Sequence, residues 1–151
     1  MNLRNNTYPN DMKFLKVENC GTVNVEENAF SGLKQLAVIN ITNVANLDVA
    51  ENGFRWKERF DPTVPVKGII VNLKNVTIEE LPAFAFSGNL DAVIMSDVLI
   101  RNMRTFAFTD VWKIGRIEMT GFEITIMEES VSLYSCHQQR SCLLPSLFLI
   151  Q

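Results

Sequence analysis

Two stretches of the chain decide its fold: residues 75–86, NVTIEELPAFAF, and residues 97–108, DVLIRNMRTFAF. Their apolar positions coincide at a shift of 22 residues, and both end on an Ala-Phe pair. Further copies run from Asn43 to Phe54, end at Phe30 and begin at Gly121. A unit this short cannot bury its own apolar face, so stacked copies must share one core. The sequence therefore predicts a solenoid of five repeats.

Each repeat begins with two apolar residues two positions apart, which places both side chains on one face of a strand. A third apolar position follows three residues later, at spacings of 24, 32, 22 and 24 along the chain, and the long spacing maps to an insertion loop at residues 55–66. We predict an α/β-type or mostly β solenoid with a parallel sheet of about five short strands. The inward residues are Leu15/Val17/Cys20, Ile39/Ile41/Val44, Val71/Leu73/Val76, Val93/Met95/Val98 and Ile117/Met119/Phe122.

The repeat also sets the expected domain limits. Residues 12–133 form the solenoid, residues 1–11 an unstructured N-terminal tail, and residues 134–151 a C-terminal tail that matches no repeat. No apolar run is long enough to span a bilayer, and residues 1–11 lack the apolar segment of a signal peptide. We interpret the chain as a fragment or truncated gene product whose open solenoid ends favour self-association.

Composition excludes several functions. The 151 residues carry a net charge of −3, which gives no basic surface for nucleic acid. A single histidine excludes zinc sites that need two, and no glycine-rich phosphate loop is present. We predict no catalytic residue, no cofactor and no metal.

The junction between repeats carries a family resemblance. It reads AFSGL at residues 29–33, AFSGNL at residues 85–90 and AFTD at residues 107–110. These segments resemble the leucine-rich-repeat superfamily in its irregular, BspA-like form, and are similar to extracellular leucine-rich-repeat proteins of insects. The resemblance implies a non-catalytic protein that binds proteins or glycans, secreted or at the cell surface. Four aromatic residues should stack as an inner core column: Phe30, Phe54, Phe86 and Phe108.

The same strand register predicts an outward face. Its residues are mostly polar around one apolar centre and show no single charge sign, which suits recognition of a protein better than of a polyanion. The central outward residues are Lys16, Asn40, Asn72, Ile94 and Glu118. The flanking outward residues are Glu18, Thr42, Lys74, Ser96 and Thr120.

Three N-x-[ST] sequons mark candidate glycosylation sites at Asn5, Asn40 and Asn75. A glycan on Asn40 would obstruct the outward face, so either Asn40 is unmodified or that face does not bind a partner. Cys20 reads as a small buried hydrophobe. Cys136 and Cys142 form either a disulfide or two free thiols in the tail; zinc held with His137 lacks a fourth ligand.

We therefore expect an interaction module for an unidentified protein ligand. One alternative is a parallel β-helix enzyme acting on carbohydrate, which needs acidic residues clustered on one sheet, whereas only Glu18 and Glu118 point outward there. The acidic pairs at residues 26–27, 79–80 and 128–129 read as solvated surface. A second alternative is a purely structural spacer.

Overall fold

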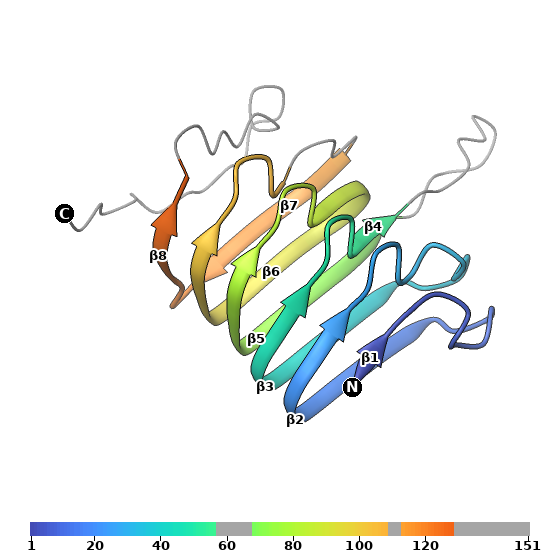
Figure 1. Cartoon of the computed structure of the whole chain (residues 1–151). Helices are drawn as coiled ribbons and strands as arrows, with labels where there is room; N and C mark the ends of the chain where they lie inside the picture. The colour runs from blue at the N-terminus through green and yellow to red at the C-terminus, as the bar shows by residue number, and fades with distance from the viewer. Residues whose placement is uncertain (57–67, 109–112, 129–151) are drawn as a thin grey trace.

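The computed structural model describes residues 1–56, 68–108 and 113–128, which form a parallel β-solenoid (Figure 1). The mostly β form of the predicted solenoid is confirmed, since the described residues contain no helix. Strands pair in the order β1-β2-β3-β5-β6-β4, and β7 and β8 both pair with β6. The strands are β1 (Asn2–Leu3), β2 (Phe14–Val25), β3 (Val38–Val49), β4 (Phe54–Trp56), β5 (Ile69–Leu81), β6 (Phe86–Met103), β7 (Lys113–Thr120) and β8 (Glu123–Met127).

The strand register is the predicted one. Pairs join Leu15 to Ile39, then to Val71, Val93 and Ile117 on successive strands. The apolar residue two positions later follows the same path. These inward side chains are buried in the first four rungs and half-buried in β7, the last of the series. Period-two alternation therefore sends one row of each strand into a shared core.

Each long strand bends midway, which the sequence did not predict. The bend falls at a residue with positive φ, a backbone state that Asn, Asp and Gly tolerate better than other residues do. The strands pair on both sides of the bend, so β2, β3, β5 and β6 are 12 to 18 residues long rather than short. The corner residues are Asn19 (54°), Asn43 (53°), Asn75 (51°), Asp97 (54°) and, between β7 and β8, Gly121 (58°).

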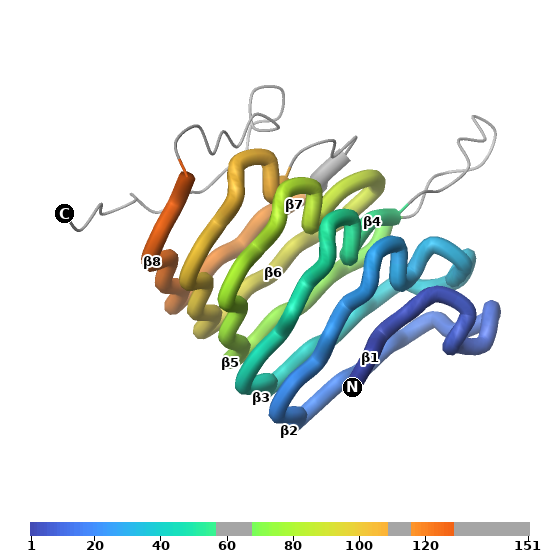
Figure 2. The backbone as a smooth tube through the Cα atoms, in the orientation of Figure 1, coloured from blue at the N-terminus to red at the C-terminus, as the bar shows by residue number. Residues whose placement is uncertain are grey.

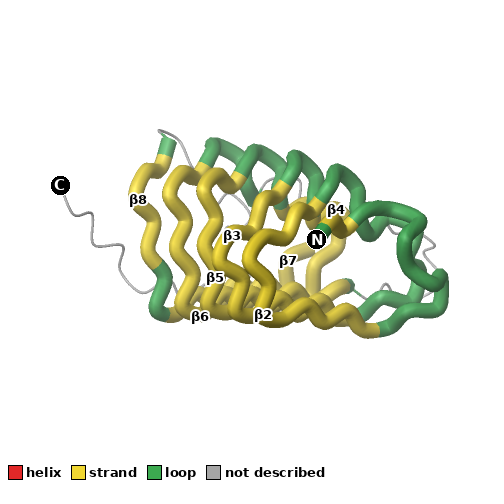
Figure 3. Tube along the Cα trace, turned by 60° about the horizontal axis from the view of Figure 1, so that its bottom comes forward, coloured by secondary structure: helices red, strands yellow, loops and turns green. Residues whose placement is uncertain are grey.

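The corner divides every rung into two arms, which Figures 2 and 3 show side by side along the solenoid. We call the stretch before the corner the first arm and the stretch after it the second arm. The first arms are residues 14–18, 38–42, 70–74, 92–96 and 116–120. The second arms are residues 20–25, 44–49, 76–81, 98–103 and 123–127.

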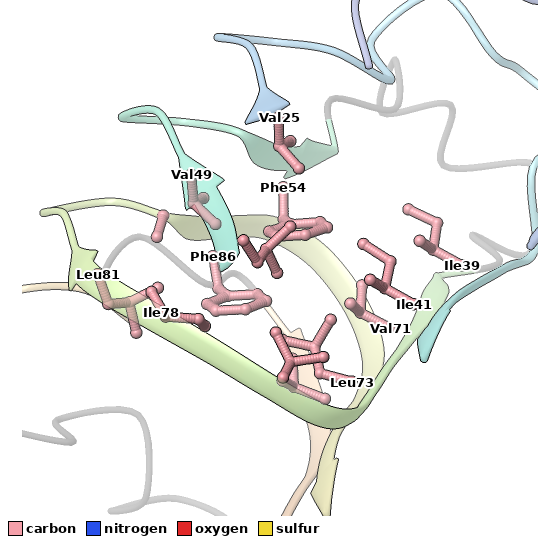
Figure 4. Packing of buried hydrophobic residues seen from close by; sticks show 14 of the residues in the cluster. Val25, Ile39, Ile41, Val49, Phe54, Val71, Leu73, Ile78, Leu81 and Phe86 are labelled. Atoms are coloured by element: carbon pink, nitrogen blue, oxygen red, sulfur yellow. The ribbon is translucent and has the colours of Figure 1, made fainter. Parts of the chain in front are cut away.

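A column of four phenylalanines lies in the core between the two arms, and Figure 4 shows its two central members, Phe54 and Phe86. Neighbouring rings stack with centroid distances of 5.8 Å for Phe30–Phe54, 4.9 Å for Phe54–Phe86 and 5.0 Å for Phe86–Phe108. All four side chains are at most 5% exposed. Stacked rings at this spacing add to the free energy already gained from burial, so the predicted core column is confirmed.

The N-terminal end of the solenoid begins earlier than predicted. The sequence predicts an unstructured tail at residues 1–11, yet Asn2 and Leu3 form β1 on the second arm of β2. Leu3 is fully buried, and the Met1 ammonium group donates to the Thr22 carbonyl oxygen at 2.9 Å. Two residues are too few for a periodic signal, which explains the error.

Parts of the predicted insertion and tail lie outside the described residues. Of the insertion at 55–66, Arg55 and Trp56 belong to β4, which pairs with β6, and the remainder is not described. The end of the predicted solenoid at residues 129–133 and the predicted tail at residues 134–151 also lie outside the described residues.

Replacement of Phe86 by alanine tests the core column. Because this ring is fully buried between two others, Phe86→Ala should lower the free energy of unfolding by about 3–5 kcal/mol in urea titrations. Phe106→Ala is the control, since that ring is 45% exposed and its loss should cost about 1 kcal/mol or less. Equal losses for the two variants would contradict the core role of Phe86.

Candidate functional site

The outer face of the first arms brings together the residues predicted to form the interaction surface. Strand pairs join Lys16, Asn40, Asn72, Ile94 and Glu118 into one continuous column. A second column joins Glu18, Thr42, Lys74, Ser96 and Thr120. Neighbouring members lie on adjacent strands about 4.8 Å apart. The side chains of Asn72 and Ile94 are half-buried rather than buried, as the predicted outward register requires.

The structure adds a third column that sequence reasoning missed. It lies one alternation step earlier in each first arm and is apolar in four of its five residues. The Phe14 ring is 51% exposed. The sequence could have predicted this column, because the period-two alternation extends one step further toward the start of each strand. The column consists of Phe14, Val38, Ile70, Ala92 and Arg116.

Polar groups of the outer face bond to one another. Asn72 donates through Nδ2 to Asn40 Oδ1 at 2.6 Å, and Thr120 Oγ1 lies 3.2 Å from Ser96 Oγ. Ion pairs join Lys16 to Glu18 and Arg116 to Glu118 within β2 and β7. These ion pairs are exposed, so each contributes little to stability. The face therefore has an apolar edge, a mostly polar remainder around Ile94, and an ion pair at each end.

The corner asparagines form a ladder. Asn43 Nδ2 donates to Asn19 Oδ1, and Asn75 Nδ2 donates to Asn43 Oδ1, both at 3.0 Å. Each amide thus bonds to the same position on the preceding rung. The side chains also stand where the backbone is left-handed, so the ladder fixes the corners in register.

The three sequon asparagines occupy different environments. Asn75 is exposed at the corner within β5, and the Nδ2 atom that would carry a glycan donates to Asn43. Asn40 lies in the central column of the outer face, as predicted. Asn5 is exposed, and its Oδ1 accepts from the Asn6 amide at 2.9 Å.

Carboxylates of two acidic pairs bridge neighbouring rungs. Glu79 and Glu80 are exposed, as the predicted solvated surface requires, and Glu128 is half-buried. Glu79 accepts from Arg101 at 3.0 Å, and Arg104 donates to both Glu80 and Glu128. The hydrogen bond from the Thr105 amide and the pairing with Arg104 lower the pKa of Glu128. The two carboxylates in turn raise the pKa of Arg104. Glu129 lies outside the described residues.

Cysteine chemistry is limited to one thiol in the described ranges. Cys20 pairs in register with Val44, but its side chain is half-buried rather than buried, and Sγ lies 3.4 Å from the Glu18 carbonyl oxygen. Cys136, His137 and Cys142 fall outside those ranges. Within residues 1–56, 68–108 and 113–128, no three Cys, His, Asp or Glu side chains are placed to hold a metal.

The same ranges include no helix of the length and apolarity that a membrane crossing requires. Comparison of the chain with protein-family models, curated proteins and solved structures gives no match. The chain is therefore assigned on its own geometry as a repeat protein with a parallel β-solenoid fold.

Substitution of Asn43 tests the corner ladder. Asn43→Ala removes two amide hydrogen bonds. It also leaves alanine, which has no side-chain amide to favour this backbone state, in the left-handed region, so it should lower the free energy of unfolding by about 1–2 kcal/mol. Asn43→Gly removes the same bonds but accepts the backbone state, and should cost clearly less. Chemical denaturation measures both, and equal losses would show that the left-handed backbone carries no constraint.

Acidification tests the bridge at Glu128. Its folded-state pKa lies below the ordinary value of 4.5, so the bridge stabilises the fold fully above that value and is lost as pH falls through the folded-state pKa. Glu128→Gln should lower the urea midpoint at pH 7. The difference in urea midpoint between the variant and the native chain should become smaller toward pH 3. A gap that is independent of pH would rule out the charge as its cause.

Proposed function

We propose that this chain is a non-catalytic interaction module of a secreted or cell-surface protein of the leucine-rich-repeat type, BspA-like in form. A protein partner would bind the outer face of the first arms. The observation that carries this proposal is the composition of that face, where a mostly apolar column lies beside two mostly polar columns on paired strands.

The character of the outer face favours a protein over a polyanion. The face combines mostly exposed or half-buried apolar side chains with amide and hydroxyl groups. Four of its five charged residues form two pairs of opposite sign, and the fifth is Lys74. Protein interfaces have this mixture of apolar and polar groups. Because the side chains stand on hydrogen-bonded strands, the backbone is already ordered and would lose little conformational entropy on binding.

Glycosylation is part of the proposal. Asn5 is the most accessible acceptor, because it is exposed and its Nδ2 has no bond among the described residues. Asn75 would have to keep its ladder bond while carrying a glycan. Asn40 stands in the middle of the outer face, so it stays unmodified if that face binds a partner.

A carbohydrate-active parallel β-helix enzyme is the second candidate, favoured by the long parallel strands that stack as rungs. The described carboxylates do not support it. On the first arms, Glu18 and Glu118 stand at opposite ends and each pairs with a cation, while Glu79, Glu80 and Glu128 hold arginines. Cleavage of polysaccharides with added calcium would favour the enzyme over the interaction module or a structural spacer.

Replacement of Ile94 tests the outer face. The full chain is screened against arrays of extracellular protein domains and of glycans, and each signal is measured again with Ile94→Arg. A cation at the centre of the face should weaken binding at least about tenfold. Ala45→Arg is the control, because Ala45 is exposed on a second arm of β3 and should leave binding unchanged. Equal binding by both variants would show that the partner binds another surface.

A further inference from the structure

We propose that the C-terminal end of the solenoid binds a second copy of this chain, with the free edge of β7 pairing antiparallel to β7 of that copy. The pairing is centred on Ile117, and the result is a closed, tail-to-tail dimer. This interface lies at the C-terminal edge of the outer face and includes Arg116 and Glu118 of that face, but it does not depend on the function proposed above.

The first argument is that β7 is an unpartnered edge. Within the described ranges it pairs with β6 alone, so the backbone groups of its other edge have no strand beside them. The inward residues Ile117 and Met119 are half-buried, whereas their counterparts on β6 are fully buried. Beyond the corner, Ile126 and Met127 on β8 are exposed. Such an edge readily pairs with another chain.

The second argument is charge complementarity. Arg116 and Glu118 flank Ile117 on the outer side of β7, are exposed, and form an ion pair with each other. In an antiparallel pair centred on Ile117, Arg116 of each copy faces Glu118 of the other. Oppositely charged residues directly opposite each other stabilise a strand pair, and like charges there destabilise it. The sequence of β7 is therefore complementary to itself in this register.

The third argument excludes head-to-tail growth. In the register of the solenoid, the first arm of β2 in a second copy would follow β7, and β8 would then occupy the place beside β2 that β1 fills. That addition would expel β1 with its fully buried Leu3. The tail-to-tail pair leaves β1 in place and closes on a two-fold axis, as most homo-oligomers do.

The dimer would join the two first-arm sheets into one. A two-fold axis perpendicular to the sheet keeps the outer side of each copy on the same side. The half-buried Ile117 and Met119 would gain cover from the second copy, as their counterparts in the inner rungs gain it from the next rung. The charge pairs would become a group of four alternating charges.

Sedimentation velocity of the full chain tests the proposal, at concentrations from about 1 to about 100 µM, the range of weak protein association. The native chain should pass from a 17.1 kDa monomer to a dimer of twice that mass. Arg116→Glu places two glutamates opposite each other, and Glu118→Arg two arginines, so each should raise the dissociation constant at least about tenfold. An equimolar mixture of the two variants restores opposite charges at every contact and should dimerise again.

Lys16→Glu and Glu18→Lys are the matched controls, because they alter the corresponding ion pair on β2 at the other end. They should leave the dimer unchanged. Loss of association in Lys16→Glu would instead indicate head-to-tail stacking, in which Glu118 meets Lys16 of the next copy, and would overturn the proposal. Failure of the mixture to dimerise would overturn the antiparallel register.

Hydrogen exchange of the native chain gives a readout that needs no variant. Amides of β7 should exchange more slowly as concentration rises, while those of the β2 first arm should not change. A monomer throughout the concentration range would overturn the proposal and leave another cover for this edge, such as residues 129–151 or a different protein.

Discussion

The left-handed corner is the constraint on which the rest of the structure depends. A straight strand would bury its apolar row against one layer only, and a repeat of 22 to 24 residues could not close around a core. Turning at Asn19, Asn43 and Asn75 lets the first and second arms of each rung face the same phenylalanine column. Because every rung turns at the same place, the asparagine amides also meet and hold neighbouring corners in line. At Asp97 and Gly121 the backbone state persists without the amide, so the conformation continues further than the ladder does.

The core depends on that corner, but the burial of its residues differs between the inner rungs and the two ends of the solenoid. In the inner rungs the inward residues of both arms and the stacked rings are almost fully buried, which is the larger part of the stabilising free energy. At the N-terminal end, β1 and the partly buried Tyr8 and Met12 pack against the first rung. At the C-terminal end, the inward residues of β7 and β8 are only partly buried. The stability of the solenoid should therefore decrease toward its C-terminal end.

Much of the first arm could be predicted from the sequence, because strict alternation fixes both its inward and outward rows. The phenylalanine column could also be predicted, since the Ala-Phe pair recurs at the repeat period. The second arm could not, because its spacing changes between rungs. The buried residues are Val44, Leu47 and Val49 in β3 but Val76, Ile78 and Leu81 in β5. Ion pairs such as Arg104 with Glu80 and Glu128 depend on which residues of three rungs meet, and no local pattern encodes that.

The two ion pairs of the outer face lie at the two ends of the solenoid, and Lys74 on β5 is the remaining charged residue of the face. Lys16-Val17-Glu18 on β2 and Arg116-Ile117-Glu118 on β7 share one pattern, a cation and an anion on either side of an inward apolar residue. The three inner first arms lack such a pair. At the register positions of Lys16 and Glu18 they carry Asn40 with Thr42, Asn72 with Lys74, and Ile94 with Ser96. Charges on an outermost strand discourage indiscriminate pairing with other edges, yet an alternating pair still permits one antiparallel register with itself. At the N-terminal end β1 covers the second arm of β2, whereas no described strand lies beyond β7 and β8 at the C-terminal end, so the C-terminal edge is the more open of the two.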